Sequence, residues 1–429
     1  MHQLSRNAIQ PHERFTDRAR MPTMKIRLSA ARIWDGTAPT TTREALNLIV
    51  DRGEITSVGS SLGGTSESIV RLPPGAVAIP GLIDAHVHMD LDPFLLAPDD
   101  QFKPSRSDRD LRMIARAGAM VAAGITTARD LGAGEWRELA LRDAIARGEL
   151  PGPRLVCAGQ PLTVDQGHCH FWGGVATGAE EQAQVVRRQL AHGVDWVKVM
   201  ATGGYFTKGS GVERAQFSAE ELRQAVGLAG EAGLAVAAHC HGKAGIRNAA
   251  QAGVRTIEHC SFASGEGYGA DYDADVVKEI AAAGTWVSPT VNANWLRRMK
   301  KDGAPTDFFR NMRGVLGGLR EAGIPLLAST DAGIPGVHHH RLAAGLLAFA
   351  KYGDLSPVEV LRTATSDSAL GLGLESICGR LEPGLSADVL VFAGDPLEDL
   401  ALLENPILVL ARGRIAHRDP SVPAPVAAA

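Results

Sequence analysis

The sequence predicts an α/β fold: a (β/α)8 TIM barrel inserted into a small β-sandwich domain that both termini form. Two observations predict the barrel, because short apolar runs recur along the middle of the chain and amphipathic, helix-like stretches separate them. A third observation predicts the sandwich, since strand-like segments flank the repeating region on both sides. The eight apolar runs occupy residues 78–83, 124–130, 153–159, 194–201, 234–240, 254–260, 285–290 and 324–330.

The flanking segments read as strands because apolar and polar residues alternate in them. Residues 24–30 and 46–59 show this alternation, with a hairpin turn at Arg52. Residues 379–394 and 406–418 show it again, and we expect them to pair with the N-terminal strands. The predicted parts of the chain are a flexible leader (1–23), the first half of the sandwich (24–80), the metal-dependent barrel (81–372), the second half of the sandwich (373–418) and a disordered Pro/Ala-rich tail (419–429).

Between the flanks, the barrel elements follow from the type of each segment. The apolar runs are nearly continuous, which is typical of parallel strands covered on both faces. Residues 107–124 and 218–233 are amphipathic, and the second stretch opens with a capping box from Ser218 to Glu221. A doubly wound open sheet is the alternative. No GxGxxG follows the first run, which argues against a dinucleotide-binding version.

Composition and charge exclude several classes of function. The chain has 429 residues, a net charge of −4 and 45% hydrophobic residues, so we expect no nucleic-acid partner. The absence of 18 consecutive apolar residues argues against a membrane partner. Five cysteines without a CxxC motif favour a reducing, cytoplasmic location. We further expect a small-molecule substrate and a homo-oligomer.

Residue types suited to metal binding stand where five of the apolar runs end. Reactive groups of a barrel collect at the carboxyl ends of its strands, so we expect these side chains to converge. Neutral imidazole suits Zn, Co or Fe, and a carboxylate adds an anionic oxygen. Two histidines two apart could instead be structural, but the other positions favour a metal site. The candidate metal-binding residues are His86, His88, Lys198, His239, His259 and Asp331.

Lys198 is the unusual member of this set. An ammonium cannot bind a metal, and it is unfavourable inside a barrel. One interpretation is a lysine that forms a salt bridge with Asp331 or Asp130. The other is an amine that has reacted with CO2, since the resulting carbamate is an anion able to bridge two metals. His241 competes with His239 for the ligand role, and we favour His239 because it ends the apolar run.

The motifs resemble those of the amidohydrolase superfamily, and specifically its binuclear carboxylated-lysine subtype. Within it, the chain is similar to the Xaa-Pro dipeptidase-like, imidazolonepropionase-related group, which includes phenylurea and thiocarbamate hydrolases. The similarity extends from about Ile26 to Arg414. It rests on the segments PGLIDAHVH, AGITTARDLG, GHCHFWGG, WVKVMATGG, AQFSAEEL, AAHCHGKAGI, AGVRTIEHC, STDAG and GRLEPGLSADVLV.

The resemblance implies two divalent metal ions, zinc first and cobalt, manganese or iron as alternatives, with a carbamate on Lys198. It implies that His86, His88, Lys198 and Asp331 hold the more buried ion. The more exposed ion would be held by Lys198, His239 and His259. A hydroxide between the ions would attack the substrate carbonyl, and Asp331 would transfer its proton to the leaving amine as the catalytic residue.

Several loop residues are candidates for substrate contact. His168 resembles the loop histidine that contacts the substrate carbonyl or carboxylate in the group. His241, Tyr205 and Arg214 are further candidates, although a surface tyrosine and a solvated arginine are reasonable alternatives for the last two. Asp84 and Glu258 precede candidate ligands and are expected to orient them.

These features predict a metal-dependent hydrolase of amide-like C–N bonds in dipeptides or N-acyl amino acids. The alternative substrates are neutral ureas, carbamates or aryl amides. A free substrate carboxylate requires a cation at the rim, for which Arg214 and Lys208 are the candidates. A neutral substrate would favour an aromatic pocket. A non-catalytic barrel is the remote alternative, and the complete set of candidate ligands argues against it.

Overall fold

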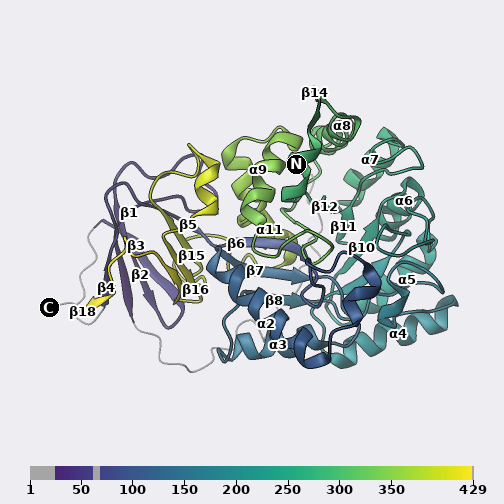
Figure 1. Cartoon of the computed structure of the whole chain (residues 1–429), viewed down its shortest axis with the longest axis horizontal. Coiled ribbons are helices and arrows are strands. Elements are labelled where there is room, and N and C mark those ends of the chain that lie inside the picture. The colour runs from purple at the N-terminus through teal and green to yellow at the C-terminus, as the bar shows by residue number, and fades with distance from the viewer. Residues whose placement is uncertain (1–24, 61–67, 428–429) are drawn as a thin grey trace.

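The computed structural model describes residues 25–60 and 68–427 (Figure 1). The predicted leader lies outside the described residues. Strands from both ends of the chain lie together at one side of the molecule, and the barrel with its helices forms the rest (Figure 1). The terminal strands are β1 (Ile26–Ile33), β2 (Leu46–Asp51), β3 (Glu54–Gly59), β4 (Ser68–Arg71), β5 (Val77–Pro80), β15 (Val389–Phe392), β16 (Leu408–Ala411), β17 (Arg414–Arg418) and β18 (Val426–Ala427).

The terminal strands form one sheet that joins the two ends of the chain. β5 is antiparallel to β15, and β1 is parallel to β5 through Arg32 and Ile33. The earlier part of β1 lies between β2 and β4, with a register irregularity between Leu28 and Ala31. The strands enclose a single core, to which both ends contribute Ile26, Val50, Ile55, Val70, Val389, Val391, Leu408, Leu410 and Val422.

The C-terminal tail was predicted to be disordered, but residues 419–427 have a defined structure. β18 is antiparallel to β4, and Val422 is fully buried. Main-chain hydrogen bonds to an edge strand and one apolar anchor therefore give residues 419–427 a defined path, which composition alone does not predict. Residues 428–429 lie outside the described part of the chain.

Parallel strands in the middle of the chain close into the predicted barrel. Three form one group, β6 (Leu82–Val87), β7 (Ile125–Asp130) and β8 (Arg154–Cys157). Four form another, β9 (Val197–Met200), β10 (Val236–Cys240), β11 (Thr256–His259) and β12 (Trp286–Ser288). Single parallel bridges join Leu162 to Val199, Val287 to Leu326 and Val87 to Ala332. The segment 326–332 is therefore the eighth strand, and it closes the ring.

The first predicted apolar run, 78–83, divides between two domains. Its first part belongs to β5 of the terminal sheet, and the barrel strand β6 starts at Leu82. A Cβ atom on Gly81 would lie 2.1 Å from Oγ1 of Thr126 on β7, so the crossing requires glycine. The apolar pattern continues through this division because both strands are buried.

Helices cover the outside of the barrel, and the capping box from Ser218 to Glu221 is present at the start of α5. None of the helices in residues 25–60 and 68–427 has the length and apolarity needed to span a bilayer. The helices are α2 (Arg106–Ala122), α3 (Arg137–Ala146), α4 (Gly178–His192), α5 (Ala219–Glu231), α6 (Lys243–Ala252), α7 (Ala274–Ala283), α8 (Asp307–Glu321), α9 (Leu342–Gly353), α10 (Pro357–Thr363) and α11 (Ser366–Leu372).

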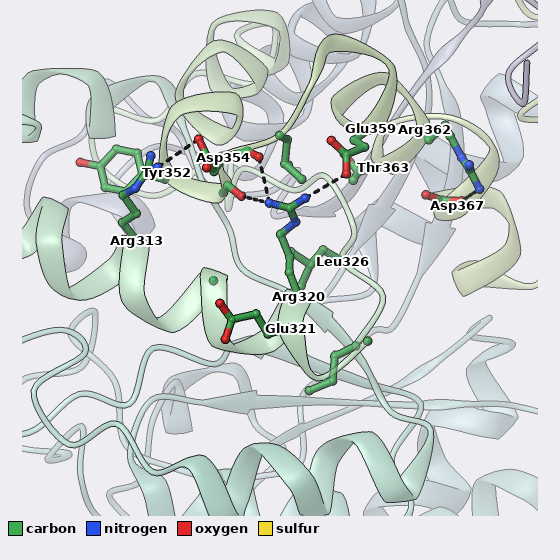
Figure 2. Close-up of a pocket in the computed structure, with 15 residues that line it drawn as sticks. Arg313, Arg320, Glu321, Leu326, Tyr352, Asp354, Glu359, Arg362, Thr363 and Asp367 are labelled. Atoms are coloured by element: carbon green, nitrogen blue, oxygen red, sulfur yellow. Dashed lines mark hydrogen bonds and ion pairs between the residues drawn. The ribbon is translucent and has the colours of Figure 1, made fainter. Parts of the chain in front are cut away.

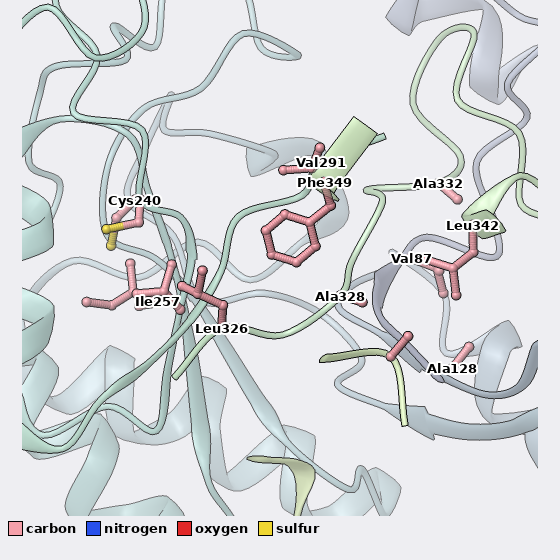
Figure 3. Close-up of a cluster of buried hydrophobic side chains, with 14 of the residues drawn as sticks. Val87, Ala128, Cys240, Ile257, Val291, Leu326, Ala328, Ala332, Leu342 and Phe349 are labelled. Atoms are coloured by element: carbon pink, nitrogen blue, oxygen red, sulfur yellow. The ribbon is translucent and has the colours of Figure 1, made fainter. Parts of the chain in front are cut away.

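Apolar side chains from strands and helices pack together in the main core (Figure 3). Ile257 of β11 and Val87 of β6 lie on the strand side, and Phe349 of α9 fills the space beside them. All three side chains are at most 1% exposed. This dense packing makes the barrel a rigid base for polar groups at its mouth.

Candidate metal centre

The six predicted ligands lie at or just beyond the carboxyl ends of the barrel strands. His86 is on β6, Lys198 on β9, His239 on β10 and His259 on β11, while His88 and Asp331 follow β6 and the eighth strand. Five of the side chains are buried and Asp331 is partly buried. The barrel therefore gathers them at one mouth, as the pattern of strand ends predicted.

His86, His88 and Asp331 form the first cluster. Nε2 of His86 lies 3.3 Å from Nε2 of His88 and 3.4 Å from Oδ1 of Asp331. Nε2 of His88 lies 3.3 Å from the same carboxylate oxygen. Three electron-rich atoms thus face one another within 4.8 Å, an arrangement that suits a divalent cation.

Hydrogen bonds on the outer ring nitrogens orient the two imidazoles of this cluster. Nδ1 of His86 donates to Oε2 of Glu258 at 2.8 Å, and Nδ1 of His88 donates to the carbonyl oxygen of Gly132 at 2.9 Å. Each Nε2 therefore keeps its lone pair, and that lone pair points into the cluster. This geometry fits a metal site better than it fits a structural histidine pair.

Behind His86, a buried ion pair holds Glu258. Arg129 donates to Oε1 of Glu258 at 2.9 Å, and both side chains are completely buried. The guanidinium also donates to the carbonyl oxygen of Ala85 and lies 4.5 Å from the ring centroid of Trp196. Burial raises the pKa of Glu258, but Arg129 and His86 outweigh it and hold the carboxyl ionised.

A second cluster contains His239, His241 and His259, whose ligand atoms also lie within 4.8 Å of one another. Nδ1 of His259 hydrogen-bonds to Oγ1 of Thr290 at 2.9 Å, and Nδ1 of His241 to Oγ of Ser261 at 2.8 Å. His241 is therefore as close to this cluster as the favoured residue, His239, so both alternatives remain in the geometry.

Burial sets the protonation of the histidines. It lowers the pKa of His241 to about 4 and that of His168 to about 3. Burial, together with the positive charge of Lys198, lowers the pKa of His86 to about 4. These imidazoles are neutral near pH 7, which is the form that can bind a metal. Burial raises the pKa of Asp331, but His86 and His88 lower it below its ordinary value.

Lys198 is 1% exposed, and burial lowers the pKa of its amine despite the opposing effects of Glu258 and Asp331. Within the described residues, its Nζ has no hydrogen bond or ion pair. The salt bridge to Asp331 or Asp130 that the sequence left open is therefore absent from this part of the chain. A lowered pKa favours the neutral amine, the form that reacts as a nucleophile.

A cavity of about 360 Å³ opens above both clusters. Three predicted substrate-contact residues line it, His168, His241 and Tyr205. Nδ1 of His168 is buried and has no hydrogen-bond partner among the described residues, so a ligand could satisfy it. A Cβ atom on Gly204 would lie 2.4 Å from Cε1 of His168, which shows how closely the loop holds this ring.

Arg214 does not line the cavity, although the sequence placed it among the substrate contacts. Its carbonyl oxygen accepts a hydrogen bond from Gly203, and Ala215 forms an antiparallel bridge with Thr202. The segment therefore folds back along the end of β9 and leaves the Arg214 side chain exposed. Lys208, the other predicted rim cation, is also exposed and outside the cavity lining.

Two walls of different chemistry border the cavity. One wall is apolar and consists of Leu91, Trp172, Met200, Phe206 and Ile334. The other carries polar groups and consists of Tyr205, Tyr268, Thr290, Asn292 and Trp295. Sequence reasoning missed Tyr268, whose only signal is its place in the Gly-rich loop after β11.

A second cavity of about 720 Å³ lies between the ends of α8 and α9 and the start of α10 (Figure 2). Its arginines are paired, with Arg313 3.0 Å from Asp354 and Arg320 2.9 Å from Glu359 (Figure 2). The two cavities have no lining residue in common, and the histidine clusters line the smaller one. The smaller cavity is therefore the candidate active site.

Comparisons with known proteins agree with this assignment. The sequence profile of the Amidohydrolase family matches residues 77–416. Ochratoxinase of Aspergillus niger is 28% identical over 379 residues, which cover 80% of this chain and 75% of that protein. The crystal structure of a Xaa-Pro dipeptidase with bound methionine is 25% identical in sequence and has a TM-score of 0.80. The match covers 91% of this chain and 99% of that one. Phenylurea hydrolase B shares the fold, with a TM-score of 0.77 at 21% identity over 94% of this chain and 99% of that one.

Replacing Glu258 with glutamine tests the support behind His86. The amide keeps the shape of the side chain but removes the negative charge of the carboxylate that accepts the hydrogen bond from His86. Zinc affinity should therefore fall about 10- to 100-fold. Competition with a chromophoric chelator measures that affinity. Glu220→Gln, at an exposed position of α5, is the control and should leave affinity unchanged. Equal zinc affinity in both variants would contradict the role of Glu258.

Proposed function

This chain belongs to the amidohydrolase family, and from that premise we propose that it uses two divalent metal ions to hydrolyse dipeptides or N-acyl amino acids. It is a hydrolase that acts on carbon–nitrogen bonds of small molecules. The observation that carries the proposal is the convergence of His86, His88 and Asp331, with unprotonated nitrogens and a carboxylate oxygen 3.3–3.4 Å apart.

The two clusters support the assignment of ligands. His86, His88 and Asp331 would hold one ion, and His239 and His259 the other. A carbamate on Lys198 would contribute to both, because the ammonium form is disfavoured at this buried position. Zinc suits a site rich in neutral imidazole, and cobalt, manganese and iron are the alternatives.

Bound divalent ions lower the pKa of a water molecule and polarise a substrate carbonyl. Oδ1 of Asp331 faces the two histidines, which leaves Oδ2 to accept the proton of the attacking water. The same oxygen then returns the proton to the leaving nitrogen. His168 and Tyr205 line the cavity beside this position and would donate hydrogen bonds to the carbonyl oxygen.

A second class of substrate is supported by the apolar wall of the cavity. Leu91, Trp172 and Phe206 could accommodate the aryl or alkyl part of a neutral urea, carbamate or aryl amide. Ochratoxinase, a dipeptidase and a phenylurea hydrolase all occur among the similar proteins, so both classes belong in the test.

A hydrolysis screen tests the proposed function directly. The protein is loaded with Zn, Co or Mn and offered dipeptides, N-acyl amino acids and arylureas. We expect turnover of N-acyl amino acids or dipeptides, its loss after chelation and its return when metal is restored, because the histidines and Asp331 need the ions to act. Metal analysis should find up to two ions per chain. No metal after supplementation would refute the proposal.

Asp331→Asn separates proton transfer from metal binding. The amide retains an oxygen that faces His86 and His88 but cannot accept the proton, so kcat should fall about 10²- to 10⁴-fold. Metal content, measured on the same preparation by mass spectrometry, should stay near that of the unaltered protein. A variant that keeps both metal and activity would exclude Asp331 as the proton carrier.

Lys198→Ala tests the carbamate. Removing the amine should leave the protein nearly inactive, because neither ion would retain the bridging anion. Short-chain carboxylates supplied at high concentration should restore part of the activity by taking the same place. Lys278→Ala, at an exposed position of α7, serves as the control and should be fully active. Full activity of Lys198→Ala in the absence of added carboxylate would contradict the proposal.

A further inference from the structure

Arg298 lies at the end of the 3-10 helix η3 (Ala293–Arg298), in the connection that follows β12. Its guanidinium carbon is 3.3 Å from the ring centroid of Phe308 and 5.6 Å from that of Tyr268. The hydroxyl of Thr306 donates to its carbonyl oxygen and fixes the main chain. The side chain is therefore held against two aromatic rings, although it is exposed.

These rings lead from Arg298 to the metal centre. Tyr268 stacks on Tyr205, with ring centroids 5.2 Å apart and an angle of 10° between the planes. Both rings meet His241 edge-on, at 5.3 Å for Tyr205 and 5.6 Å for Tyr268. His241, Tyr205 and Tyr268 line the cavity, and Arg298, which is not part of the lining, lies next to it through its contact with Tyr268.

The charge of Arg298 has no counterion among the described residues. By contrast, Arg112 and Arg116 both form ion pairs with Asp92, and the arginines of the larger cavity are also paired. Among the residues that line the cavity, Lys198 is the one lysine or arginine, and Arg298 lies next to the lining residue Tyr268. An unpaired guanidinium held on aromatic faces is weakly hydrated and suited to a carboxylate.

The positive charge of Arg298 acts on the hydroxyl groups of Tyr205 and Tyr268. Burial raises the pKa of both Tyr205 and Tyr268, and the positive charge of Arg298 opposes that rise at each hydroxyl. Both phenols stay protonated near pH 7, so they can donate hydrogen bonds to an anion. Tyr205 and Tyr268 thus present donors to the cavity, and Arg298 adds a charged donor beside Tyr268.

We propose that Arg298 determines specificity by binding a free carboxylate of the substrate at the mouth of the cavity. The proposal rests on the proposed function and narrows its substrate class to amides that carry a carboxylate, such as N-acyl amino acids. The apolar wall would then receive the hydrophobic part of the molecule. Arg298 would take the role that the sequence gave to Arg214 and Lys208, because it is held against Tyr268, a residue of the cavity lining.

The test compares N-acetyl-phenylalanine with its methyl ester as substrates of the metal-loaded enzyme. In Arg298→Met, KM for the acid should rise at least about tenfold, because a charge-assisted hydrogen bond is lost. The value of kcat should change little, and both constants for the ester should stay the same, as followed by amine release. Arg298→Lys should recover part of the affinity for the acid. Arg297→Met, on the same 3-10 helix, is the matched control.

Equilibrium binding of the same two compounds to metal-depleted protein gives a readout that needs no turnover. Loss of acid binding in Arg298→Met, with ester binding unchanged, supports the proposal. An equal effect on acid and ester, or no effect on either, overturns it and leaves a structural role. If the unaltered, metal-loaded enzyme cleaves neither compound nor any other amide, the proposed function fails. The binding measurement still decides whether Arg298 recognises the carboxylate.

Discussion

Two main-chain hydrogen bonds between the first and eighth barrel strands set the geometry of the candidate metal centre. The N–H of Asp331 donates to the carbonyl oxygen of His86 at 2.9 Å, and the N–H of His88 donates to that of Ala332 at 2.7 Å. Three of these residues supply the side chains of the first cluster, so barrel closure and cluster assembly are one event. A shift of one residue in this pairing would turn alternate side chains to the opposite face and separate Asp331 from the histidines.

Backbone strain accompanies this arrangement at the strand ends. His259, Thr290 and Asp331 have φ angles of 63°, 53° and 61°, in the left-handed region that non-glycine residues seldom adopt. Each such residue costs on the order of 1–3 kcal/mol and persists only where the surroundings enforce it. Here the strain turns the chain at the mouth of the barrel, so that Oγ1 of Thr290 reaches Nδ1 of His259. The strained backbone therefore lowers the stability of the fold at the residues that orient the candidate metal ligands.

The sequence predicted the strand-end residues better than the loop residues, for a physical reason. The carboxyl ends of parallel strands must meet at one mouth, so His86, His239 and His259 converge whatever the loops do. Arg214 and Arg298 both follow barrel strands, and nothing in their local sequence distinguishes their roles. Their positions depend on long-range pairing, because one segment folds back along β9 while aromatic rings hold the other.

The difference between strand-end residues and loop residues separates the groups that would carry out the reaction from those that would select the substrate. Groups on the strands fix the position of His86, which is hydrogen-bonded to Glu258 of the buried Arg129–Glu258 pair. Residues on the connections, such as Tyr268 of the cavity lining and Arg298 beside it, are exposed or half-exposed and contribute less to the fold. Substitution in these connections can therefore alter which amide is bound while the proposed proton path through Asp331 remains the same. The hydrolytic chemistry is thus a property of the barrel mouth, and the substrate class is a property of the loops around it.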